Sequence, residues 1–559
     1  MSTVRRGDSM QFHVLIPARL QRVNLNGRLT HIVTAVLLIT PVLLQALLVL
    51  PRILNWWPVW AWYPDPGYQY LWAGGSLVNG GTTDLIFHPG TSFQWLIGAS
   101  QVITYRVAGQ DTLMLDVASR PEFYSQTAGL VLAILFVVAL GVASWRMFRH
   151  LGLWPAVTFQ LLLLWGLPLL SFGRFVLWPE SLVLTSAVAS IAIIAPQLGG
   201  KISLHPKTQA VGLGLIAAVG MTAKVTYLPI VILVVLVLGR RRFAIFLLSL
   251  IASALLLMIP VYSRFDDMFR WFRQITIQPG RHGQTGSWEP LNNFVEFALM
   301  LNGYVRWFIP VFLVIAAGSI LIGIFLKRTS GKEWIPVVAL LLTAGAVLLS
   351  GLKDSELRDF ILIIPVMAAL AAITLSQALK ALHGYVRTGA VVTMLLVGSF
   401  LAAHGVVHEQ NFHQGYSIRL SEIVRDAKTI DRMNKASSWA TGYNAWTLDS
   451  AKVFGLLWSA GSFNAQVREV NPNALHFDLF SREIVHVAPD NTLVPLSCQE
   501  MEEKISYKGL GVIVESQSHL QFSDNDTRID LNNATAGYEG PKPLGRYFAY
   551  ALTDIDCKR

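Results

Sequence analysis

Long runs of apolar residues, separated by short polar segments, dominate the chain from residue 31 to residue 406. A helix needs about 20 predominantly apolar residues to cross roughly 30 Å of hydrocarbon, and these runs approach or exceed that length. We therefore predict an α-helical polytopic membrane protein with about eleven transmembrane helices. The division of residues 208–239 into two spans rests on Lys224 alone. The predicted spans are 31–50, 125–145, 153–171, 180–197, 208–223, 225–239, 243–262, 304–326, 335–352, 360–378 and 388–406.

Different patterns flank this predicted transmembrane domain, 31–406. Residues 1–30 are polar, and the first span lacks a small-residue cleavage site after it, so we interpret it as a membrane helix rather than a signal peptide. In the tail, 407–559, apolar residues recur at helical spacing over 417–435, and short β-branched or aromatic runs such as "LGVIVES" and "RYFAYALTD" are typical of strands. We predict a soluble α/β domain there. It has no recognisable catalytic motif, so we expect it to bind or position something.

Composition and charge support this organisation. Of all residues 53% are hydrophobic and only 14% are charged, against about 25% charged in soluble domains. With a cytoplasmic N-terminus, the inner segments are rich in Lys and Arg and hold only two acids, Asp8 and Glu333. The net charge of +10 is thus interpreted as a topology signal, not a nucleic-acid footprint. We predict a bacterial inner membrane protein whose C-terminal domain is extracytoplasmic.

The two cysteines, Cys498 and Cys557, both lie in that predicted outer domain. An oxidising compartment favours a disulfide between them, which would tie the chain end to the domain. Two unrelated buried thiols are the alternative.

The first predicted outer loop, 51–124, is longer and more polar than a connection requires. It contains Asp65 between two prolines, Tyr68, Asp84 and His88, together with several tryptophans. Two pieces, "GYQYLWAGGSLVN" and "SFQWLIGASQVITYR", have helical apolar spacing with polar faces, which predicts interfacial helices along the membrane surface. The tryptophans fit either an aromatic belt or sugar stacking.

Several cations are predicted on the same outer side. Arg281 and His282 lie in the Gly- and Pro-rich turn "QPGRHGQTG", which has no adjacent acid. Lys353 and Arg358 alternate with acids, so ion pairs with these neighbouring acids explain them as well as contact with a donor does. Arg174 and Lys224 lie near the membrane surface, either retained for function or snorkelling to the interface. We take these six residues as candidate contacts for an anionic donor.

This combination suits transfer of a sugar from a polyprenyl-phosphate carrier to an acceptor on the outer face. Such a reaction needs a carboxylate to take the acceptor proton, cations to stabilise the departing phosphate, and an apolar groove for the lipid. The sequence supplies one prominent acid, several cations and a bundle of helices. It suggests an enzyme acting on a glycan, lipid or protein acceptor, with no nucleic-acid partner.

The stretch "YPDPGYQYLWAGGSLVNGGTTDLIFHPGTSFQWL" resembles the first outer loop of the C-type membrane glycosyltransferase superfamily, especially the branch of protein mannosyltransferases and aminoarabinose transferases. "WPESLVLTSAVAS", "GMTAKVTYLPIVIL" and "KDSELRDFILIIPVMAAL" match further pieces in order. The resemblance, over about residues 30–380, implies an inverting glycosyltransferase with Asp65 as base or acceptor-orienting group. Lys224, Lys353 and Arg358 match the carrier-phosphate positions only approximately.

One departure from the family pattern concerns the second acid that many relatives carry directly after the first. Pro66 occupies that position here, which puts any mechanism that needs the pair, or a metal held by it, in doubt. Asp84 or His88 are the candidates to replace it. With a monophosphate leaving group no cofactor is assigned, and a divalent metal stays open.

Two other functions remain open from the sequence. In a transporter or flippase of lipid-linked saccharides, the outer cations would contact the substrate without chemistry, but the sequence shows no convincing internal repeat, and its conspicuous charges lie at the outer ends of the spans. A polysaccharide ligase or polymerase calls for a long outer loop late in the bundle, whereas here the long loop comes first.

Overall fold

The structure is a computed structural model of the 559-residue chain. It describes residues 32, 34–36, 38–39, 42–43, 64–83, 85–86, 90–171, 177–200, 205–277, 290–329, 334–350, 360–382, 384–434, 439–441, 452–453, 455–456, 463–472, 475–478, 483–495, 497, 499, 510–515, 542–544 and 547–552.

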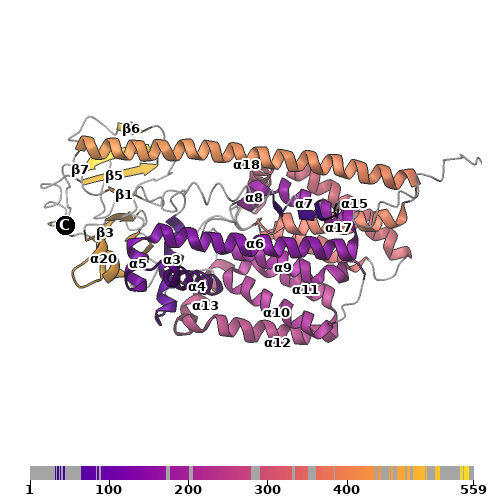
Figure 1. Ribbon diagram of the computed structural model, residues 1–559, viewed down its shortest axis with the longest axis horizontal. Coiled ribbons are helices and arrows are strands. Elements are labelled where there is room, and N and C mark those ends of the chain that lie inside the picture. The colour runs from indigo at the N-terminus through magenta and orange to yellow at the C-terminus, as the bar shows by residue number, and fades with distance from the viewer. Residues whose placement is uncertain are drawn as a thin grey trace, which may run out of the picture.

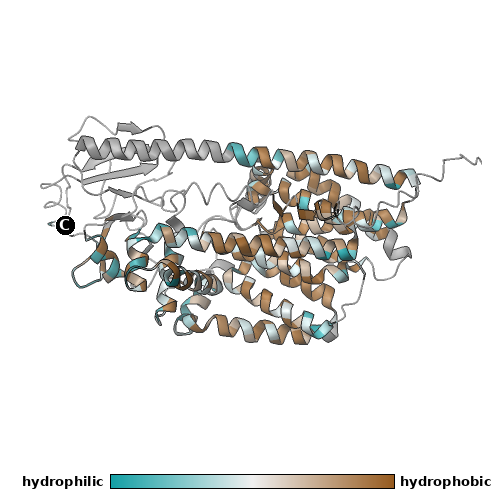
Figure 2. Ribbon diagram, in the orientation of Figure 1, coloured by the Kyte–Doolittle hydropathy of each residue, from teal (hydrophilic) through white to brown (hydrophobic). Residues whose placement is uncertain are grey.

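A bundle of apolar helices forms the larger part of the molecule (Figure 1). The helices are hydrophobic along most of their lengths, and hydrophilic residues gather mainly towards their ends (Figure 2). The bundle comprises α6 (Pro121–Leu151), α7 (Leu153–Trp165), α8 (Leu167–Ser171), α9 (Pro179–Leu198), α10 (Pro206–Ala223), η2 (Val225–Tyr227), α11 (Leu228–Leu238), α12 (Arg240–Leu257), α15 (Phe308–Thr329), α16 (Ile335–Ser350), α17 (Ile363–Ala381) and α18 (Gly384–Asn434).

The predicted spans from 125–145 onward coincide with helical residues over most of their described lengths. Within the described part, four helices are individually long and apolar enough to cross a membrane, and counting two bent pairs as one span each raises this to six. The span 153–171 is interrupted at Gly166, between α7 and α8. The chain is thus a multi-pass helical membrane protein, and the number eleven stays a prediction.

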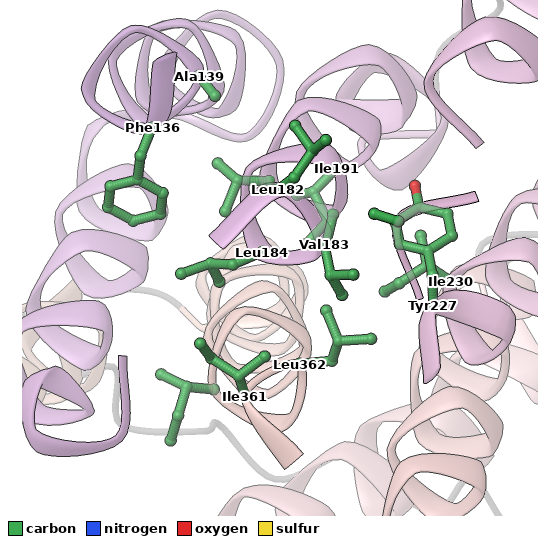
Figure 3. Packing of buried hydrophobic residues seen from close by; sticks show 14 of the residues in the cluster. Phe136, Ala139, Leu182, Val183, Leu184, Ile191, Tyr227, Ile230, Ile361 and Leu362 are labelled. Atoms are coloured by element: carbon green, nitrogen blue, oxygen red, sulfur yellow. The ribbon is translucent and has the colours of Figure 1, made fainter. Parts of the chain in front are cut away.

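The bundle has a continuous apolar core around α9. Nearly every residue of α9 is buried, because α6 and α10 pack against it and α17 lies close by. In Figure 3, Phe136 of α6, Val183 and Leu184 of α9, Tyr227 of η2 and Ile361 before α17 lie within one packed cluster. A helix that is apolar all round is buried in this way.

The first loop forms three further helices, α3 (Pro64–Val78), α4 (Thr91–Ala108) and α5 (Leu113–Ser119). The two predicted helices of the loop are therefore confirmed as α3 and α4. Gly74 and Gly98 allow them to approach closely, since a Cβ on Gly98 would lie 2.4 Å from the Gly74 carbonyl oxygen.

The expectation that α3 lies along the membrane surface stays a prediction, but α3 is covered by other parts of the protein. Residues 67–77 are buried, and Trp72 is 0% exposed, so this tryptophan belongs neither to a belt nor to a sugar platform. The second helix, α4, does expose an apolar stripe, formed by Trp95, Ile103 and Val107. Only α4 has the exposed apolar face that an interfacial helix requires.

Two sharp bends lie between helices of the second half. The chain bends by 73° between α12 and η3 (Ile259–Arg264), which leads into α13 (Phe265–Ile277). It bends by 103° between α14 (Pro290–Tyr304) and α15, where Trp307 has a positive φ of 70°. The first bend turns the amphipathic helix α13 away from the direction of α12.

The last helix, α18, contains both the predicted final span and most of the predicted amphipathic helix, 417–435. Its 51 residues correspond to about 75 Å of helix, far more than a bilayer core. It extends from the bundle to the strands (Figure 1). The predicted tail helix is thus the continuation of the last span.

Two small sheets lie at the far end of α18. In one, β1 (Trp439–Thr441) pairs in parallel with β5 (Leu510–Glu515), which pairs antiparallel with β7 (Tyr547–Leu552), followed by β6 (Lys542–Leu544). In the other, β3 (Glu483–Val487) lies between β2 (His476–Asp478) and β4 (Leu493–Pro495), both antiparallel to it. The short helix α20 (Asn464–Val470) precedes this second sheet. The two strands predicted from "LGVIVES" and "RYFAYALTD" are confirmed and pair with one another.

Candidate functional site

Three helices begin with a proline followed by an acid. Pro64 and Asp65 open α3, Pro121 and Glu122 open α6, and Pro179 and Glu180 open α9. Proline suits the first turn because the missing N–H has no intrahelical acceptor there, and an acid stabilises the positive end of the helix dipole. The prolines beside Asp65 therefore lie in the first turn of a helix.

Asp65 lies one helical turn before Tyr68, so the two residues share a face of α3. The side chain of Asp65 lies outside the described part of the chain. The Tyr68 hydroxyl is fully buried and donates a 2.5 Å hydrogen bond to Oε1 of Glu122. This bond ties the first turn and a half of α3 to the start of α6.

Lys224 forms a buried ion pair with Glu180. Its Nζ lies 2.6 Å from Oε1 of Glu180, and the two side chains are 4% and 2% exposed. Lys224 ends α10 in an extended conformation (φ −160°, ψ 139°), which directs the chain into η2. Since Lys224 is buried, it does not snorkel to the interface.

A second ionic cluster attaches α5 to α6. Nε of Arg120 donates a 2.8 Å hydrogen bond to the buried Asp116, and the Tyr124 hydroxyl donates another of 2.5 Å. Burial alone would raise the pKa of Asp116, but these hydrogen bonds and the charge of Arg120 outweigh it and hold the pKa below its usual 3.8. Asp116 is therefore ionised at neutral pH, as part of the packing of this loop.

Hydrogen bonds and an ion pair connect these groups into one region at one end of the bundle. Tyr68 joins α3 to the start of α6, Ser92 at the start of α4 donates a 2.8 Å hydrogen bond to the Val219 carbonyl near the end of α10, and Lys224 joins that end to the start of α9. The strands lie at the same end as α3, α4 and α5 (Figure 1). We call this region the acid end of the bundle, after Asp65, Glu122 and Glu180.

Sequence reasoning missed Glu122 and Glu180. The available signal was the dipeptide Pro–Glu directly before a long apolar run, which occurs in "RPEF" and "WPES". It indicates a helix start, but it does not reveal the partners Tyr68 and Lys224. Of the predicted site residues, the structure thus places Asp65, Tyr68 and Lys224 at the acid end.

The other predicted residues lie outside the described residues. They are Asp84, His88, Arg174, Arg281, His282, Lys353, Arg358, Cys498 and Cys557. Their proposed roles, and the disulfide, stay predictions. Within the part of the chain that the structure describes, no three His, Cys, Asp or Glu side chains come together to hold a metal ion.

Comparison with known proteins gives matches at the level of solved structures. No family model matches the sequence, and no curated protein matches it either. The structure is similar to that of ArnT from Cupriavidus metallidurans bound to undecaprenyl phosphate, with 14% identity, 91% of this chain and 98% of that chain covered, and a TM-score of 0.49. It is also similar to the archaeal oligosaccharyltransferase AglB from Archaeoglobus fulgidus, in complex with an inhibitory peptide and a dolichol-phosphate, with 13% identity, coverage of 83% and 74%, and a TM-score of 0.40.

Proposed function

We propose that the protein is an integral membrane glycosyltransferase that transfers a sugar from a polyprenyl-phosphate donor to an acceptor on the outer face of the membrane. The acceptor hydroxyl or amine attacks the anomeric carbon, the bond from that carbon to the phosphate oxygen breaks, and the lipid phosphate leaves. The attack comes from the opposite side of the sugar, so the configuration inverts. Asp65 takes the proton that the acceptor loses.

The observation that carries the proposal is the position of Asp65 at the opening of α3. The hydrogen bond from Tyr68 to Glu122 ties the start of α3 to α6, and burial of residues 67–77 holds the rest of the helix in place. A general base needs such rigid support, because small errors in its position are costly. The bundle beside it supplies apolar helix surfaces suited to a lipid tail.

The neighbouring Lys224 is proposed to lie close to the carrier phosphate. Because Lys224 is paired with Glu180, the pair has no net charge and cannot by itself balance the charge of a phosphate. Further cations are therefore needed, and the candidates from the sequence are Arg174, Arg281, His282, Lys353 and Arg358. Positive groups placed where charge develops are the usual stabilisation for a departing phosphate.

The test is an assay of purified protein with a defined polyprenyl-phosphate sugar, comparing wild type with Asp65→Asn. We expect the transfer rate to fall by about 10²- to 10⁴-fold, the range for loss of a general base. Asp111→Asn is the matched control, since Asp111 is an exposed acid of the same loop, and it should retain the wild-type rate. Asp65→Glu should restore part of the activity.

An Asp65→Asn variant with the wild-type rate would remove Asp65 from the chemistry. Movement of a labelled lipid-linked saccharide across the membrane, without any covalent transfer, would instead identify a flippase. Addition and chelation of divalent metal in the same assay decides the metal requirement.

A further inference from the structure

A segment of the C-terminal part covers the face of α3 that follows Asp65. The Trp72 indole N–H donates a 3.2 Å hydrogen bond to the Lys452 carbonyl oxygen. The ring of Phe463 lies 4.8 Å, between centroids, from that of Trp72. Both rings are 0% exposed, so the contact is a full part of the apolar core.

Glycines make this approach possible from both sides. A Cβ on Gly455 would lie 2.5 Å from Nε1 of Trp72 and 2.8 Å from the Cβ of Tyr68, and a Cβ on Gly75 would lie 2.6 Å from the ring of Phe463. Distances this short exclude any side chain without movement of the neighbours. The backbone at Gly455 therefore lies directly on the two aromatic residues of α3.

The same segment also contacts α20 and the second sheet of the C-terminal part. The buried Lys452 ammonium donates a hydrogen bond to Oδ1 of Asn471, which caps the C-terminal end of α20. Val453 packs against Val485 of β3. A cation next to the negative end of a helix dipole adds to the attraction.

These contacts place the segment between α3 and the second sheet. We define the latch as Lys452, Val453, Gly455, Leu456, Phe463 and α20, which itself packs against α5. Leu456 and Phe463 belong to the same buried cluster as Tyr68 and Trp72. The apolar core of the bundle thus continues without a break into the C-terminal part.

We propose that the latch is a positioning element for the transfer reaction: it presses α3 against α6, so that Asp65 and Tyr68 are in place only while the C-terminal part is docked. This rests on the proposed function of Asp65. Any binding event that lifts the C-terminal part would loosen α3 at its middle, three to ten residues after the base. The reaction would then slow without loss of a residue that touches the substrate.

The first test substitutes Gly455→Ala in the full-length protein, with Gly141→Ala as the matched control. Gly141 lies within α6, and a Cβ added to it would have open space within 4 Å. For Gly455→Ala we expect faster amide hydrogen exchange in α3 and a fall in kcat of about 10- to 100-fold, the order that a small misplacement of a catalytic group costs. KM for the donor should stay near wild type, and Gly141→Ala should match wild type in both measurements.

The milder variant Trp72→Phe removes the indole N–H and keeps an aromatic ring, and it serves where Gly455→Ala does not fold. It should show a smaller change in the same direction. Unchanged exchange in α3, or faster exchange with an unchanged kcat, in a folded latch variant would overturn the proposal.

The exchange measurement needs no enzymatic activity, so it separates this proposal from the previous one. Full activity of Asp65→Asn together with loosened α3 and reduced kcat in Gly455→Ala would refute Asp65 as the base, and would leave standing only that the latch holds α3 in the arrangement that the reaction needs. Loss of activity in Asp65→Asn, with no effect of the latch variants on exchange or kcat, would support Asp65 as the base and refute the latch.

Discussion

The buried ion pair between Lys224 and Glu180 allows the sharpest prediction about stability. The perturbation is removal of one partner, by Lys224→Met or Glu180→Gln, and removal of both in the double variant. Met has a similar length to the aliphatic stem of Lys, and Gln has the shape of Glu. The three variants therefore change charge much more than volume.

The magnitude follows from the geometry. At 2.6 Å between Nζ and Oε1, the attraction is about 6 kcal/mol at an effective dielectric constant of about 20. Burial of each ion costs several kcal/mol, so the pair as a whole contributes little net stability. A single substitution leaves one buried charge without its counter-charge, and we expect it to lower the free energy of unfolding by about 3–5 kcal/mol. The double variant should be far less destabilised than either single variant.

The assay is reversible unfolding of the purified protein in detergent, as a full double-mutant cycle. Arg270→Met is the control, because Arg270 is 69% exposed and its Nη1 lies 3.5 Å from Asp267. A surface pair of this kind is worth less than about 1 kcal/mol. Two results would contradict an energetic coupling between Lys224 and Glu180. Each single variant could be as stable as this control, or the loss of unfolding free energy in the double variant could equal the sum of the two single losses.

Binding of the donor lipid to the double variant then decides the second proposed role of Lys224. A variant that is stable but binds the donor poorly would support contact between Lys224 and the carrier phosphate. Retained donor binding would limit Lys224 to its structural pair with Glu180.

Two further predictions concern the first loop. Gly98→Ala places a Cβ within 2.4 Å of the Gly74 carbonyl oxygen, so we expect overpacking to lower the free energy of unfolding by about 1–3 kcal/mol. Unfolding experiments measure this loss, with Gly345→Ala as the control because a Cβ there has open space. Asp116 has a pKa below its usual 3.8, so it stabilises the fold above that pH and loses the contribution as the pH falls through the folded-state pKa. Wild type should therefore be more stable than Asp116→Asn at pH 7, and the two melting temperatures should converge as the pH falls below 3.8, whereas a constant difference would contradict the assignment.

The transmembrane helices were predictable because their signal is local. Runs of apolar residues decide where a chain crosses a bilayer, and the helices from 125–145 onward followed those runs. The tail helix was predicted from its period, but its fusion with the last span into α18 was not. Residues 407–416 contain no proline, and the helix continues through them, although the loss of apolar character suggested an end.

Burial of α3 could not be read from its own residues. The residues that cover it come from a segment 380 positions away, as Trp72 and Lys452 show, and no local pattern predicts such a contact. The same holds for Lys224, whose partner Glu180 is 44 positions earlier. Sequence alone identified the cation and left its surroundings open.

The three Pro–acid helix starts decide how a variant of Asp65 has to be interpreted. An acid in the first turn of a helix contributes about 0.3–1 kcal/mol through the dipole alone, so some loss of stability in Asp65→Asn is no evidence for catalysis. Glu122 and Glu180 also open helices, yet each has a partner from another element, Tyr68 and Lys224. Their first function is to hold the acid end together. A catalytic role is therefore established for Asp65 only by a loss of rate that persists after correction for the folded fraction, and that Asp65→Glu reverses in part.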